Sequence, residues 1–146
     1  MKQEFNLQRF ITAHQHDYAR ALEEIRQGKK RSHWMWYIFP QIQGLGMSST
    51  SQFYAIESME EAKAFLADPY LGKHIVEICE VLLRLETNNA MEVFGVPDNM
   101  KLKSSMTLFA LASGKESVFT QVLDKFFDGQ YDEKTKKILR ISEHLI

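Results

Sequence analysis

The chain has 146 residues, of which 45% are hydrophobic, 12% aromatic and 25% charged. This size and composition are typical of one globular domain that buries about 70% of its unfolded surface, and they exclude a disordered protein. Its 18 basic and 19 acidic residues leave a formal net charge of -1, so no bulk field favours nucleic acid or an anionic membrane. We therefore expect a single domain over residues 1–146, without a strong signal for a nucleic-acid partner.

The first residues, Met1–Asn6, include acidic and amide side chains where a secretory signal would need an apolar stretch. No stretch of the sequence approaches the roughly 20 apolar residues of a membrane span. The single cysteine, Cys79, has no partner for an internal disulfide and lies among apolar neighbours, which favours a buried, unreactive thiol. We expect a cytoplasmic protein with no membrane partner.

Apolar residues recur at spacings of three and four along most of the chain, which is the signature of helices with one buried face. The spacing, together with capping residues, predicts about seven helices, in the ranges 7–27, 58–67, 71–85, 90–94, 97–113, 117–127 and 132–145. Their short connections predict an all-α domain, orthogonal or bundle-like. An α+β fold would need Trp36–Phe39 as a strand, and no partner strand is evident.

The segment at residues 30–47 has neither a helical nor an alternating period, and Pro40, Gly44 and Gly46 favour irregular backbone there. It combines basic, imidazole, hydroxyl, indole and amide side chains within a few residues. Together with Leu7–Phe10 and Pro97–Phe109, this segment closely resembles the domain of unknown function 1810 family, over nearly the whole chain. The resemblance implies a compact all-helical fold and a cytoplasmic setting, but no established activity.

Some proteins of this family carry the name calpastatin, which the composition does not support: calpastatins are long, disordered and proline-rich, whereas this chain has three prolines and a clear core pattern. The residues that match the family pattern most specifically are our candidates for a functional site. They are Lys30, Ser32, His33, Trp34, Trp36, Phe39, Pro40, Gln41, Gly44, Gly46, Asp98, Lys101, Ser104, Ser105 and Thr107.

Our leading hypothesis is that the segment at 30–46 packs against the helix after Pro97 and forms a pocket for a small anionic ligand, a nucleotide or an ADP-ribose-like molecule. Lysines near a helix start suit an anion, and indole rings suit a stacked base. The hypothesis assigns Lys30 and Lys101 to the anion, Trp34 and Trp36 to stacking, Ser32, Gln41, Ser104 and Ser105 to ligand binding, and His33 with Asp98 to an acid–base step.

Simpler interpretations compete with each assignment. Asp98 would cap its helix and pair with Lys101 on a solvated face, and His33 would be a hydrogen-bonded structural residue. The tryptophans would be core residues, or anchors of a non-catalytic protein–protein interaction module. Whether the protein is an enzyme, and in which oligomeric state it works, stay open.

The stretch His14–Asp17 contains two histidines at i and i+2, which point apart on a helix and so cannot share one ion. We expect an ordinary surface turn of a helix there. No other spacing of histidine, cysteine and carboxylate resembles a metal site, and dinucleotide and phosphate-loop fingerprints are missing. We predict neither a metal nor a cofactor.

Overall fold

The computed structural model describes the backbone of residues 5–144 and the side chains of residues 5–140, and it forms nine helices in that range. The helices are α1 (Gln8–Arg26), α2 (Met35–Ile38), α3 (Ser49–Phe53), α4 (Met59–Ala67), α5 (Pro69–Arg84), α6 (Ala90–Phe94), α7 (Asp98–Ser113), α8 (Val118–Phe127) and α9 (Glu133–His144). The predicted all-α class is confirmed. None of these helices is long and apolar enough to cross a membrane.

The two helices that the periodicity missed, α2 and α3, are one turn long and lie in or beside the irregular segment. A single turn is too short for an apolar repeat to appear, and it holds its shape through tertiary contacts. One isolated parallel bridge, between Ile42 and Ile56, is the β pairing found among the described residues. This bridge joins the segment at 30–47 to the chain before α4.

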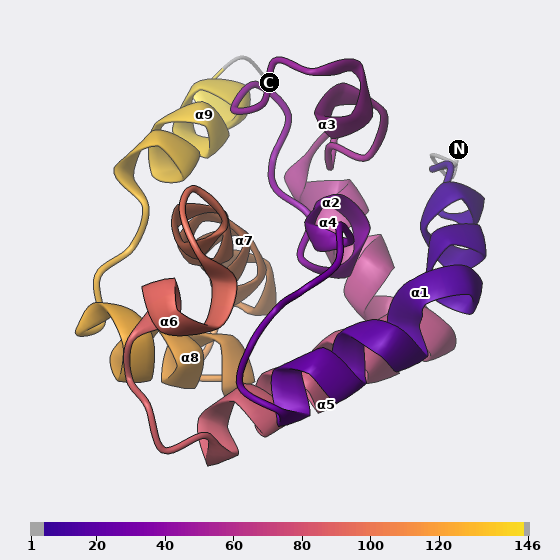
Figure 1. Cartoon of the computed structure of the whole chain (residues 1–146). Helices are drawn as coiled ribbons and strands as arrows, with labels where there is room; N and C mark the ends of the chain where they lie inside the picture. The colour runs from indigo at the N-terminus through magenta and orange to yellow at the C-terminus, as the bar shows by residue number, and fades with distance from the viewer. Residues whose placement is uncertain (1–4, 145–146) are drawn as a thin grey trace.

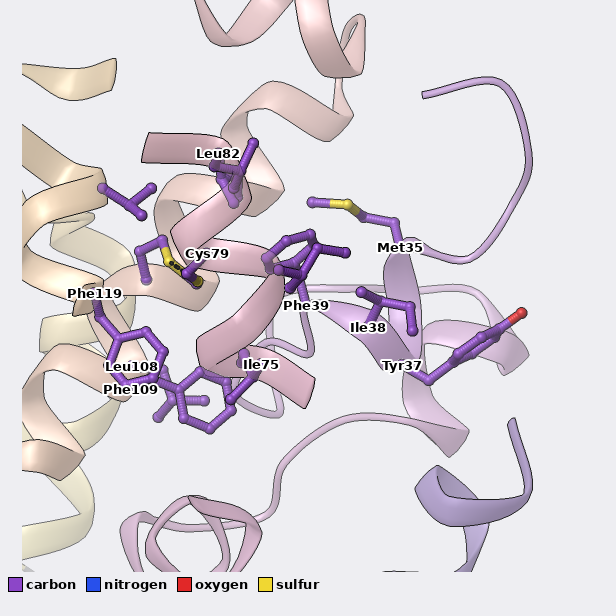
Figure 2. Packing of buried hydrophobic residues seen from close by; sticks show 14 of the residues in the cluster. Met35, Tyr37, Ile38, Phe39, Ile75, Cys79, Leu82, Leu108, Phe109 and Phe119 are labelled. Atoms are coloured by element: carbon purple, nitrogen blue, oxygen red, sulfur yellow. Dashed lines mark hydrogen bonds between the residues drawn. The ribbon is translucent and has the colours of Figure 1, made fainter. Parts of the chain in front are cut away.

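Helix α7 lies near the middle of the molecule and contacts α4, α6, α8 and α9, while α1 and α5 run side by side along one edge (Figure 1). The buried side chains of α5, among them Ile75, Cys79 and Leu82, lie between those of α2 and those of α7 and α8 (Figure 2). Cys79 is fully buried with its sulfur 3.6 Å from that of Met106. Burial raises the pKa of this thiol, so it is an unreactive core group, as predicted.

The sequence Ser58–Glu61 before and in α4 has the pattern of a capping box, which forms only in part. The Ser58 hydroxyl accepts a hydrogen bond from the Glu61 amide at 3.1 Å, but the Glu61 carboxylate accepts from the Glu57 amide rather than returning to Ser58. It also binds the guanidinium of Arg9 on α1, with nitrogen and oxygen 2.9 Å apart. The Glu61 carboxylate is thus used for the Glu57 amide and for a long-range ion pair with Arg9, and not for the Ser58 amide that a complete capping box would need.

The junction of α4 and α5 depends on Gly72, because a Cβ atom there would come within 2.2 Å of the carbonyl oxygen of Leu66. We expect Gly72→Ala to lower the free energy of unfolding by about 2 kcal/mol, since the strain of overpacking exceeds the roughly 1 kcal/mol that alanine gains as a helix former. Chemical denaturation measures this change. Lys73→Ala, at the exposed neighbouring position, is the control and should stay within about 0.5 kcal/mol of the wild type. If Gly72→Ala is as stable as Lys73→Ala, then α4 and α5 can move apart to accept the added methyl group without loss of stability.

Candidate ligand-binding cleft

A buried carboxylate on α1 shapes the segment that leads into α2. One oxygen of Glu24 accepts hydrogen bonds from the backbone amides of Arg31 and Ser32 and from the Trp34 indole, at 2.7, 3.0 and 2.9 Å. Its other oxygen accepts from the Ser32 hydroxyl at 2.6 Å. We call this arrangement the Glu24 clamp. Burial by itself would raise the pKa of Glu24, but these hydrogen bonds outweigh it and lower the pKa to about 2.

The clamp decides what Ser32 and Trp34 do in this structure. Trp34 has no exposed surface, donates its indole N–H to Glu24, and has the ammonium of Lys30 5.1 Å from its ring centroid. Its ring packs in the core against Phe39 and Phe94. A stacking role for Trp34 does not fit this arrangement, because neither face of its ring is exposed, and the Ser32 hydroxyl already donates its hydrogen to Glu24.

Trp36, by contrast, is partly exposed on the one-turn helix α2. The next residue, Tyr37, holds this helix against α1: its backbone carbonyl accepts from the His14 ring at 2.8 Å, and its hydroxyl donates to Asp17. Burial, followed by the bond to Asp17, raises the pKa of the Tyr37 hydroxyl. The helix that carries the Trp36 indole is therefore held in place by hydrogen bonds between Tyr37 and α1.

The start of α7 meets the segment at 30–47 through an ion triad of Lys30, Asp98 and Lys101. The Asp98 carboxylate lies 2.9 Å from the Lys30 ammonium and 3.4 Å from that of Lys101. Lys30 is mostly buried, and its backbone amide donates to the Val93 carbonyl at 2.7 Å. The ammonium of Lys101 lies 5.8 Å from the centroid of the Trp36 ring, within the range of a cation–π contact.

Two neighbouring cavities open around this triad, and together we call them the cleft. The larger has a volume of about 780 Å³ and the smaller about 290 Å³. Trp36, Pro97 and Lys101 line both cavities. Gln41 and Ser104 add polar groups to the larger, and further side chains reach it from the chain before α3 and from the start of α9, namely Met47, Ser48, Tyr131, Asp132 and Lys134.

Exposed apolar side chains edge the cleft. Met47 is 86% exposed, Val96 70% and Met100 49%; Met47 and Met100 line the larger cavity and Val96 the smaller. Single exposed apolar side chains are ordinary on a protein surface, and only their grouping around one cleft is typical of a contact surface. The cleft therefore combines lysines, an indole and an apolar margin.

The remaining predicted residues divide between the cleft and the core. His33 is exposed and lines the smaller cavity beside Asp98. Within the described residues no hydrogen bond joins His33 to Asp98, whose two oxygens face the two lysines. The Ser104 hydroxyl donates to the Met100 carbonyl at 3.2 Å. Ser105 is fully buried, its hydroxyl has no partner among the described residues, and it does not line the cleft.

Other residues of the family pattern shape the backbone of the segment or pack in the core. Phe39 and Pro40 are buried, Gly44 has a φ of 106°, and Thr107 on α7 is buried with its hydroxyl accepting from the Asp132 amide at 2.8 Å. This last bond fixes the approach to α9, which forms one wall of the larger cavity.

Sequence reasoning missed Glu24 and the wall that the start of α9 provides. A signal for Glu24 was present, since it lies three residues after Ala21 and beside Ile25 on the apolar face of α1, where an acidic side chain needs buried partners. No local sequence pattern predicts that Tyr131–Lys134 line the cleft, because these residues reach it only through the packing of α9 on α7.

The fold and cleft define an all-helical protein whose irregular segment is packed against the start of its central helix. The chain matches the family described as protein of unknown function DUF1810 over residues 4–139, and it belongs to that family. The crystal structure of the conserved hypothetical protein Rv1873 from Mycobacterium tuberculosis is similar, with a TM-score of 0.91 and 41% sequence identity over 93% of this chain and 97% of that chain. Among curated proteins, none matches this sequence.

Proposed function

We propose that the cleft binds a small anionic ligand with a planar ring, a nucleotide or an ADP-ribose-like molecule. The observation that carries the proposal is the pairing of the Trp36 ring with the Lys101 ammonium, 5.8 Å apart, on the wall common to both cavities. An indole face supports stacking of a base, and an adjacent ammonium attracts a phosphate. Cavity volumes of 780 and 290 Å³ suit a ligand of this size.

The lysines have different roles in this proposal. Lys30 is mostly buried against Asp98, so it neutralises that carboxylate and stabilises the cleft wall. Lys101 is about a third exposed and reaches both cavities, and Lys103 lines the larger one. The ion triad carries one net positive charge, which leaves it attractive to an anion. Gln41 and Ser104 would add hydrogen bonds to the ligand.

An acid–base step, if the ligand is a substrate, belongs to the smaller cavity. His33 has an exposed imidazole there, and histidine exchanges protons near neutral pH. Asp98 would orient His33 by accepting a further hydrogen bond, because each carboxylate oxygen has two lone pairs and its contact with one lysine leaves acceptor capacity free.

We expect a nucleotide or ADP-ribose held at 100 times its dissociation constant to raise the melting temperature by roughly 5–10 °C, equivalent to about 2.7 kcal/mol. A thermal-shift screen with adenosine monophosphate, ADP-ribose, ribose 5-phosphate and inorganic phosphate measures this. Lys101→Ala should abolish the shift, because it removes the positive charge beside Trp36, whereas Lys115→Ala, exposed and outside the cleft, should retain it. A shift that survives in both Lys101→Ala and Trp36→Ala would place binding elsewhere.

The exposed apolar margin favours one alternative, a protein–protein interaction module that associates with a second copy through this face. In that case Val96→Asp would shift a dimer to monomer in sedimentation equilibrium, since Val96 is 70% exposed and a charge there cannot be buried. Val96 also lines the smaller cavity, so the added negative charge would weaken nucleotide binding as well, and the dimer is judged by sedimentation alone. A monomer at every concentration of the wild type would remove this alternative.

A further inference from the structure

Two histidines far apart in sequence meet between α1 and α5, and neither of them lines the cleft. The Nδ1 atoms of His14 and His74 lie 2.9 Å apart. His14 is 2% exposed, so the surface turn expected from the sequence is wrong for this residue; it lies in line with Phe10 and Tyr18 on the buried face of α1. His16 does point away and is exposed, as its spacing requires.

The hydrogen bonds determine where the protons of this pair must lie. The Nε2 atom of His14 is 2.8 Å from the Tyr37 carbonyl, which can only accept, so Nε2 carries a hydrogen. In a neutral imidazole the other nitrogen then has none, and Nδ1 of His14 accepts. His74 must therefore donate from its own Nδ1, which leaves its Nε2 without a hydrogen when the ring is neutral.

The surroundings favour this neutral pair. The pKa of His14 is lowered to about 4, because burial and the nearby His74 lower it by more than the bond to Tyr37 and the charge of Asp68 raise it. Burial also lowers the pKa of His74, with Glu77 acting against it and Lys73 with it. Glu77 accepts from the Tyr18 hydroxyl at 2.5 Å, and Asp17 accepts from the Tyr37 hydroxyl. With Tyr70, these are the charged and titratable groups that face the pair from α1, α2, α5 and the residue before α5.

Aromatic packing fixes both rings in place. The His74 ring stacks on Tyr18 with centroids 3.6 Å apart and planes within 2°, and Tyr70 covers it at 4.2 Å. Phe65 of α4 packs against His14 at 6.2 Å. With the rings held in this way, the pair cannot rotate freely to accommodate a different arrangement of protons.

We propose that the His14–His74 contact is a proton-sensitive latch that joins α1, α2 and α5 while a single hydrogen lies between the two Nδ1 atoms, and opens when a second one arrives there. A first additional proton can bind Nε2 of half-buried His74 and leave the contact intact. The next must bind Nδ1 of His14, where it faces the N–H of His74. Two donors then oppose each other at 2.9 Å, and His74 has to leave the contact.

The direction of the pH effect follows from the lowered pKa values. Since an unfolded histidine titrates near 6.5, the unfolded chain takes up protons at a higher pH than the folded pair. The stability that depends on the neutral pair is therefore complete above pH 6.5 and is lost as the pH falls toward 4, through the pKa of folded His14. The two rings titrate as a coupled unit.

The test compares His14→Gln with the wild type in thermal denaturation between pH 7 and pH 4. Glutamine keeps a donor for Tyr37 and an acceptor for His74 but does not titrate, so the difference in melting temperature between wild type and variant should fall by roughly 5–10 °C on acidification. His16→Gln, at the exposed position on the same helix, should follow the wild type. If His14→Gln and the wild type have parallel pH curves, the latch does not exist.

A second measurement needs no variant and so stays decisive if His14→Gln fails to fold. Nitrogen-15 NMR of the histidine rings at pH 7 should show one ring protonated at Nε2 only, His14, bonded to one ring protonated at Nδ1 only, His74. Acidification to pH 4 should reduce the coupling between them by about half, since His14 is then half protonated. Rings that are both protonated at Nε2 at pH 7, or a contact that survives double protonation, would overturn the proposal.

Discussion

Glu24→Ala is expected to lower the free energy of unfolding by about 4 kcal/mol, one of the two largest effects we predict. The change leaves the four donor groups of the Glu24 clamp without their acceptor. Each buried donor that loses its partner costs about 1–3 kcal/mol, and the indole of Trp34 cannot reach water because it is fully buried. Denaturation in urea measures the loss.

Glu24→Gln is the matched control. Its oxygen can still accept from the two backbone amides and Trp34, and its amide can donate to the Ser32 hydroxyl if that group reverses its own hydrogen bond. Only the charge is lost, so we expect about 1–2 kcal/mol. A Glu24→Ala protein as stable as Glu24→Gln would show that the clamp is dispensable.

The clamp also makes stability depend on acid. The folded pKa of Glu24, about 2, is lower than its ordinary value of 4.5, so its contribution is complete above pH 4.5 and is lost as the pH falls toward 2. Protonated Glu24 resembles glutamine, so the loss over the whole window should match the loss of about 1–2 kcal/mol expected for Glu24→Gln. The stability difference between wild type and Glu24→Gln should therefore shrink below pH 4.5. This window lies below that of the histidine latch, so the two can be separated.

Arg9→Met should cost a similar amount, about 4 kcal/mol, because it leaves the 1% exposed carboxylate of Glu61 without its cation. Arg9 also donates at 2.8 Å to the carbonyls of Phe53, at the end of α3, and Ala55, in the chain between α3 and α4. These bonds join α1 to the stretch that carries the Ile42–Ile56 bridge. We expect the melting temperature to fall by roughly 10 °C, measured by circular dichroism.

Two further variants test the cause. Arg9→Lys keeps the charge but not the fork of donors, so it should lose about half as much stability as Arg9→Met. Adding Glu61→Leu to Arg9→Met should recover part of the loss, since the uncompensated buried charge is removed. If the double variant is less stable than either single one, the hydrogen bonds to the carbonyls outweigh the ion pair.

Sequence patterns were sufficient for the long helices, the all-α class and the family. The apolar repeat of α5 and the capping pattern before α4 predict these helices because each signal lies within a few neighbouring residues. The family pattern also predicts that the segment at 30–47 packs against the helix after Pro97. In the structure, Lys30, Asp98 and Lys101 form an ion triad at this contact.

The sequence alone could not separate the two tryptophans. Trp34 and Trp36 are the same residue type two positions apart, yet Trp34 is sealed in the core by Glu24 while Trp36 lines the cleft. His14 and His16 differ in the same way. Local composition cannot decide between such neighbours, because the acceptor or the covering helix comes from another part of the chain.

The sequence by itself determined which segments form helices with a buried face, because the spacing of apolar residues along the chain defines that face. Only the tertiary structure decided which polar groups are enclosed and which face solvent. Glu24 meets Trp34 and His14 meets His74 through contacts between separate elements, 2.9 Å apart in both cases. The burial of a polar group depends on the partner that satisfies it, and that partner is fixed by how the helices pack.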